Sequence, residues 1–133
     1  MTSILIAGVA TAWLQEASTQ GIDIGTRNDP TKIAASAKIL QQDLKSFHNT
    51  TFEIAFLHPG DASKWKKFVS VLRSRKWDCV SLGGGVRTIP ELGDYFTDLV
   101  REVVREQPGA RLIFPLLPED AGPAIRKYLP QAS

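Results

Sequence analysis

Residues 77–91 read WDCVSLGGGVRTIPE, and this stretch carries the pattern that decides the fold. A largely apolar run over residues 77–82 leads into three consecutive glycines, after which an amphipathic pattern begins. A run that is apolar at consecutive positions is typical of a strand buried on both faces of a parallel sheet. The stretch therefore predicts a buried strand, a glycine turn and a helix, in that order.

Other segments of the chain have the same apolar character and are rich in β-branched and aromatic residues. Each is short enough for a strand and is bounded by polar or turn-forming residues. Together with residues 77–82, the predicted strands are residues 3–9, 52–58 and 111–117.

Amphipathic segments separate these predicted strands. Asp29 stands before the first as an N-cap, and Asp61 is placed to cap the second. Thr88 and Glu91 have the spacing of a capping box, so we expect the third helix to begin at Thr88. The predicted helices are residues 30–47, 61–75, 88–107 and 121–129.

The alternation of strands and helices indicates βαβ units with right-handed crossovers. We predict one α/β domain over residues 1–133, a three-layer sandwich of flavodoxin-like or Rossmann-like type with a four- to five-stranded parallel sheet. Residues 10–28 are the exception to the alternation, because they form a long polar segment in which we expect only a short helix over residues 11–18. Connections of this length usually act as lids, binding loops or interaction segments.

Composition narrows the classes of protein that this chain can belong to. It has 133 residues, 43% hydrophobic and 23% charged, with a net charge of +2 and a single cysteine, Cys79. A chain of this size can build a core without disulfides, and the balanced charge argues against nucleic acid as a partner. No basic leader precedes the first apolar run, and no charge-free stretch approaches the ~18 residues that span a bilayer. We therefore expect a cytoplasmic protein without a membrane partner.

Ligands of open parallel sheets bind beyond the carboxyl ends of the strands, which is where the glycine turn lies. Glycines let the backbone approach a ligand, the following helix start offers N–H groups, and Arg87 has a planar fork suited to carboxylate or phosphate. The alternative is a tight strand-to-helix turn in which Arg87 pairs with a nearby acid. The residues predicted to form an anion pocket are Gly8, Gly83, Gly84, Gly85, Arg87 and Thr88.

Three side chains at the predicted strand ends are candidates for catalysis. His58 closes the second strand and can act as a general acid or base, with Asp120 or Glu119 as its partner or replacement. Each has a structural alternative, because His58 also fits a turn before the capping Asp61, and acids are favoured at helix starts by the dipole alone. Cys79 lies within a predicted strand, and we expect it to pack as a small buried hydrophobe.

Known cofactor motifs are missing from the chain. A dinucleotide site needs G-x-G-x-x-G after the first strand, where only Gly8 stands, and the P-loop lysine motif is absent. The two histidines and the cysteine lack the spacing of metal ligands. We therefore expect neither a cofactor nor a metal.

The segment 77–91, with a later Pro-x-Asp, resembles a family of small, functionally uncharacterised α/β proteins. The resemblance covers about half of the chain and implies the α/β fold, but it brings no activity with it. Where family members carry an Asn in the last strand, this chain has Phe114-Pro115-Leu116. The residues that carry the resemblance are Asp78, Gly83, Gly85, Val86, Arg87, Thr88, Pro90, Glu91, Pro118 and Asp120.

Two functional hypotheses follow from these residues. The first is a cofactor-independent enzyme acting on a small anionic or carbonyl-bearing metabolite, in which the glycine turn stabilises an oxyanion and His58 transfers a proton. The second is a non-catalytic module that binds a metabolite or a protein partner, with residues 10–28 making the contact. Homodimerisation through an exposed helix face would fit the second hypothesis.

Overall fold

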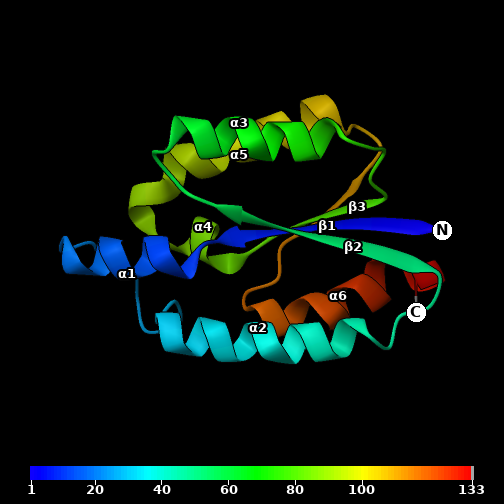
Figure 1. Ribbon diagram of the computed structural model, residues 1–133, viewed down its shortest axis with the longest axis horizontal. Helices are drawn as coiled ribbons and strands as arrows, with labels where there is room; N and C mark the ends of the chain where they lie inside the picture. The colour runs from blue at the N-terminus through cyan, green and yellow to red at the C-terminus, as the bar shows by residue number, and fades with distance from the viewer. Residues whose placement is uncertain (133) are drawn as a thin grey trace.

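Residues 1–132, which the computed structural model describes, contain one sheet of four parallel strands in the order β2-β1-β3-β4 (Figure 1). β1 pairs along its whole length with β2 on one side, and its residues 4–7 pair with β3 on the other. β3 in turn pairs with the short β4. The strands are β1 (Thr2–Val9), β2 (Thr50–Leu57), β3 (Cys79–Leu82) and β4 (Arg111–Ile113).

Helices cover both faces of this sheet, which confirms the predicted three-layer α/β fold. In Figure 1, α3 and α5 lie above the strands and α2 and α6 lie below them, while α1 extends beyond the end of β1. The helices are α1 (Thr11–Thr19), α2 (Pro30–Leu44), α3 (Ala62–Arg73), α4 (Gly84–Thr88), α5 (Gly93–Glu106) and α6 (Ala121–Tyr128). Short 3₁₀ helices are η1 (Pro90–Leu92), η2 (Pro118–Asp120) and η3 (Pro130–Ala132).

The core consists of two apolar clusters, one on each face of the sheet. On one face, Leu5 of β1 packs in a cluster with Phe68 of α3 and Leu99 of α5. On the other face, Ile4 of β1 packs with Leu40 of α2 and Ile125 of α6. Successive side chains of a strand point to opposite faces, so β1 needs apolar residues at consecutive positions.

The order of the strands reverses between β1 and β3. The chain passes from β1 to β2 on one side and then returns across β1 to reach β3 on the other. At such a switch point the connections leave the sheet in opposite directions, and a crevice opens beyond the carboxyl ends of the two strands.

Several local predictions are confirmed. Asp29 caps α2 by accepting a hydrogen bond from the Lys32 amide at 3.2 Å. Asp61 caps α3 by accepting from the amides of Ser63 and Lys64 at 3.0 and 3.1 Å. The short helix expected within residues 10–28 is α1.

The predicted helix over residues 88–107 is wrong at its start, and the capping box at Thr88 does not form. α4 begins at Gly84, and Pro90 then restricts Ile89 to an extended conformation, which ends the helix before η1 and α5. The Thr88 hydroxyl donates back to the Gly84 carbonyl at 2.8 Å.

The predicted strand over residues 111–117 is shorter than expected, because β4 ends at Ile113. Pro115 has no N–H for the ladder and has a fixed φ, so the chain leaves the sheet there. The longest helix, α2, has 15 residues, and no helix within residues 1–132 is long and apolar enough to cross a membrane.

Candidate functional site

The exits of three strands are tied together at the crevice. The Gly83 amide donates to the Ala7 carbonyl at 2.8 Å, which joins the end of β3 to β1. The Ala10 amide donates to the Leu57 carbonyl at 2.9 Å, which joins the end of β1 to β2. These backbone bonds hold the first residues of the loops in fixed positions.

A cavity of about 120 Å³ lies beside these exits, on the face of the sheet that α2 and α6 cover, and we call it the switch-point cavity. One water molecule needs roughly 15 Å³ of such space, so the cavity has room for several waters or for a small organic molecule. It is lined by Ile6, Ala7, Gly8, Val9, Thr11, Ile33, Ala37, Leu40, Gln41, Ile54, Phe56, Ser81, Gly83, Pro115, Pro118 and Ala121.

Ser81 is the one lining residue from β3, and its hydroxyl is in an unusual position. The residue is 1% exposed, and its Oγ has no hydrogen-bond partner among the described residues. Its neighbours in the sheet are Ile6 of β1 and Ile113 of β4, neither of which has a polar side chain. Most buried polar atoms of native proteins have a partner, so an unpaired hydroxyl needs an explanation.

Gly8 is open toward the cavity. A Cβ added there would meet no atom within 4 Å, in contrast to one at any of the three glycines after β3. Neither backbone strain nor close packing accounts for a glycine at this position, because its φ is not positive. A side chain introduced at Gly8 would therefore occupy the cavity space.

The glycine turn after β3 is packed against protein atoms. A Cβ at Gly84 would overlap the carbonyl of Leu116, and one at Gly85 would lie 3.3 Å from Oδ1 of Asn28. Asn28 is buried, and its Nδ2 donates to the Ile24 carbonyl at 2.8 Å and to Thr88 Oγ1 at 3.0 Å. Close approach of these neighbours explains why Gly84 and Gly85 lack side chains.

Arg87 is exposed and has no acidic partner among residues 1–132. Its Nη2 donates to the Phe114 carbonyl at 3.3 Å, where the chain leaves β4. Of the residues predicted to form one pocket, Gly8 and Gly83 line the switch-point cavity, whereas Gly84, Gly85, Arg87 and Thr88 do not.

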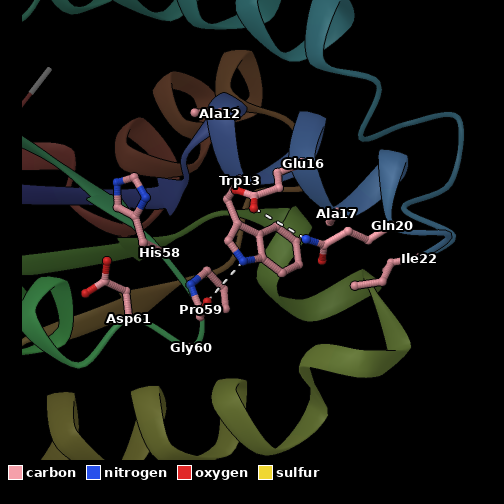
Figure 2. A pocket seen from close by; sticks show the side chains of 10 residues that line it. All are labelled: Ala12, Trp13, Glu16, Ala17, Gln20, Ile22, His58, Pro59, Gly60 and Asp61. Carbon is pink, nitrogen blue, oxygen red and sulfur yellow. Dashed lines mark hydrogen bonds between the residues drawn. The ribbon is translucent and has the colours of Figure 1, made fainter.

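His58 lines a second hollow, which we call the His58 cleft. Its volume is about 350 Å³, and it lies between α1 and the loop from β2 to α3 (Figure 2). The indole N–H of Trp13 donates to the Pro59 carbonyl at 3.0 Å and fixes α1 against that loop. The cleft is lined by Ala12, Trp13, Glu16, Ala17, Gln20, Ile22, His58, Pro59, Gly60 and Asp61.

The polar groups that line the His58 cleft differ in how many hydrogen bonds they already make. The His58 imidazole makes no hydrogen bond within the described part of the chain and is half-buried. Glu16 accepts one hydrogen bond from Gln20 Nε2 at 3.4 Å, so its carboxylate can accept further hydrogen bonds. Asp61 is engaged as the cap of α3, and the hydrogen bonds from Ser63 and the Lys64 amide hold its pKa below the usual range.

The structure does not bring His58 together with Glu119 and Asp120. The Glu119 amide donates to Ser36 Oγ of α2 at 2.9 Å, and the Asp120 carboxylate accepts from the Leu117 amide at 3.0 Å. Neither acid lines the His58 cleft, where Glu16 is present instead. Sequence reasoning also missed Ser81, whose only signal is a hydroxyl within an apolar run.

Cys79 packs in the core, as the sequence predicts. Burial raises the pKa of the Cys79 thiol to about 12, so the group stays protonated and packs in the core. Within residues 1–132, no three His, Cys, Asp or Glu side chains are grouped so that they could hold a metal ion.

Comparison of the chain with protein-family models, with curated proteins and with solved structures found no match. The family resemblance carried by residues between Asp78 and Asp120 therefore stays a prediction.

Proposed function

We propose that this protein binds a small, largely apolar metabolite that bears a carbonyl group, and that the ligand occupies the switch-point cavity. The observation that supports this is the Ser81 hydroxyl, which is buried at the cavity wall without a partner. A buried hydroxyl that makes no hydrogen bond costs about 1–3 kcal/mol. A ligand carbonyl that accepts from Ser81 would remove this penalty and would fix the orientation of the ligand.

The other lining residues favour an uncharged ligand. Among residues 1–132, none of the side chains around the switch-point cavity is charged, and Thr11 and Gln41 are the only polar ones besides Ser81. Transfer of an isolated carboxylate or phosphate into such surroundings is strongly unfavourable. Of the two metabolite classes that the sequence suggests, this favours the carbonyl-bearing one over the anionic one.

The lining also favours binding without turnover. General acid–base catalysis needs a side chain such as His, Asp, Glu or Lys within hydrogen-bond reach of the reacting atom. Within the part of the chain that the structure describes, no His, Asp, Glu or Lys lines the switch-point cavity. The ligand would therefore leave chemically unchanged, as it does from a sensor or a carrier.

A pair of probes with the same six-membered carbon ring tests this proposal. Cyclohexanone and cyclohexane should both shift the amide NMR signals of cavity residues, but only cyclohexanone can accept a hydrogen bond from Ser81. Ser81→Ala should weaken cyclohexanone binding about fivefold, the equivalent of one hydrogen bond of ~1 kcal/mol, and should leave cyclohexane unaffected. Equal affinity of cyclohexanone for both proteins would overturn the role of Ser81.

A second substitution tests the location. Gly8→Val should abolish binding, because its side chain enters open space in the cavity. Gly109→Val is the matched control, since a Cβ at Gly109 also meets nothing within 4 Å but lies outside the cavity. Binding that survives Gly8→Val would place the ligand elsewhere.

We also propose a second candidate, a cofactor-independent enzyme whose site is the His58 cleft. This rests on an imidazole without a hydrogen-bond partner that shares a cleft of about 350 Å³ with the Glu16 carboxylate. In this role His58 would move a proton and Glu16 would orient or stabilise the imidazolium. His58→Gln should then abolish turnover of any substrate found and leave cyclohexanone binding unchanged. Full turnover by this variant would discard the candidate.

A further inference from the structure

The two edge strands of the sheet differ in how well they are protected against pairing with a further strand. β4 is three residues long and is followed by Pro115, a residue that ends pairing. β2 is eight residues long, contains no proline or lysine, and has no strand on its outer side within residues 1–132. A long unprotected edge strand presents unpaired N–H and C=O groups, which pair readily with another strand.

β2 also presents apolar side chains on one face. Phe56 is 64% exposed and Ile54 is 40% exposed. Phe52, two residues earlier, points to the same face and is half-buried. Ile54 is in register with Ile6, which belongs to the cluster under α2 and α6, so the three side chains lie on that face. Exposed apolar groups in a row mark an interaction surface more often than isolated ones do.

The opposite face of the same edge carries three charged side chains, Glu53 of β2 and Lys64 and Lys67 of α3, of which Lys64 lies nearer the start of α3. Glu53 of β2 and Lys67 of α3 line one groove of about 240 Å³. Neither forms an ion pair within the described residues, although both are exposed. α3 starts beyond the end of β2 and runs back above it in Figure 1, so the groove follows the outer side of the strand.

We propose that β2 pairs antiparallel with β2 of a second copy of this chain, around a two-fold axis at Ile54. A two-fold axis perpendicular to the sheet reverses the partner strand and keeps the faces aligned. Phe52 then lies opposite the partner's Phe56, and Ile54 lies opposite its own copy. Glu53 then faces the partner's Lys67 across the seam, because the axis brings the two copies of the groove that these residues line next to each other. The spacing of β2 is thus self-complementary in both shape and charge.

The interface shares Ile54 and Phe56 with the lining of the switch-point cavity, so the variants that test it are chosen away from that cavity. Glu53 and Lys67 line neither the switch-point cavity nor the His58 cleft, so substitutions there test association alone. Sedimentation velocity over a range of protein concentrations should show the wild type as a monomer and dimer in equilibrium. Glu53→Lys and Lys67→Glu should each raise the dissociation constant about tenfold, because each creates two like-charge contacts per dimer.

Mixing the two single variants gives the sharpest test. In a mixed dimer, Lys at position 53 meets Glu at position 67, and the remaining Glu53 and Lys67 also face each other. The mixture should therefore dimerise as tightly as the wild type, and so should the double variant Glu53→Lys/Lys67→Glu. Glu91→Lys and Lys38→Glu, which make the same charge changes at other exposed positions, are the controls and should leave dimerisation unchanged.

Three outcomes would overturn the proposal. A wild type that stays monomeric at the highest soluble concentration shows that the edge has no such partner. If neither charge reversal changes the dissociation constant of the dimer, the two copies associate through another face. Assemblies that grow beyond the dimer indicate open-ended contacts, and not a closed two-fold interface.

Discussion

Gly83, Gly84 and Gly85 have different surroundings, although they are identical in the sequence. A Cβ added at Gly83 would lie 3.4 Å from the Ala7 carbonyl oxygen, which is an ordinary van der Waals contact. A Cβ added at Gly84 would instead overlap the Leu116 carbonyl. The overlap is with backbone, so a rotamer change cannot relieve it. Gly84 is therefore the position where the turn depends on glycine for packing.

We expect Gly84→Ala to lower the free energy of unfolding by about 1–3 kcal/mol, because the added methyl must displace the chain after β4. Urea denaturation followed by circular dichroism measures this change. Gly109→Ala is the control, because a Cβ there meets nothing within 4 Å, and its effect should stay within about 0.5 kcal/mol. An alanine at position 84 that leaves stability unchanged would show that residue 116 moves freely.

Asp43 and Arg126 form a bidentate ion pair between α2 and α6. Nη1 and Nη2 of Arg126 donate to the two carboxylate oxygens at 3.0 and 2.6 Å, and Nη2 also donates to Ser46 Oγ at 2.8 Å. The hydrogen bonds from Arg126 hold the pKa of Asp43 below its usual range, against the opposing effect of burial. The folded state therefore favours the ionised carboxylate.

This pair predicts a pH dependence of stability with a definite sign. Since the pKa of Asp43 is lower in the folded than in the unfolded chain, its contribution is present above about pH 4 and is lost as the pH falls further. Arg126→Gln should be less stable than the wild type at neutral pH, and the difference should shrink in acid. Urea titrations at a series of pH values check this, and a difference that is constant down to pH ~2 would contradict it.

Among the elements, α2 depends on a local capping interaction that is easily tested. Asp29 accepts from the Lys32 amide, and Pro30 occupies the first helical position. Asp29→Ala should lower the free energy of unfolding by about 1 kcal/mol, whereas Asp29→Asn should retain most of the stability because asparagine also caps. Thermal denaturation of the two variants compares them directly, and equal losses would show that capping is not the cause.

The elements also show which features can be predicted from the sequence. Strands that are buried on both faces, such as β1 and β3, appear as apolar runs, and the caps of α2 and α3 depend on neighbouring residues only. Pro90 indicates that a helix is interrupted before α5, whereas the capping pattern at Thr88 indicates that a helix begins there. The sequence favoured the wrong start because both patterns are local and only the packed turn decides between them.

The candidate sites were less predictable because they depend on contacts between distant segments. The serine at position 81 is visible within its apolar run, but the lack of a partner follows from Ile6 and Ile113 beside it. Glu16 reaches the His58 cleft only because Trp13 anchors α1 to the loop after β2. The closing of the glycine turn by residue 116 likewise depends on the path of the chain after β4.

At the scale of the whole molecule, stability is expected to be highest in the two central strands. β1 and β3 are flanked by strands on both sides, and Leu5 and Val80 are completely buried. Amide hydrogen exchange followed by NMR should therefore be slowest in β1 and β3 and faster in α1 and at the outer edge of β2. Equal protection of α1 and β1 would contradict this ranking.

The one thiol of the chain lies inside this most protected region. Cys79 is fully buried in β3, and the raised pKa of its thiol, about 12, leaves almost no thiolate to react. A thiol reagent can therefore reach it only when the central sheet opens. The rate of labelling, followed by mass spectrometry, would measure how often the whole domain opens without any engineered probe, and the thiol should withstand oxidants as long as the domain stays folded.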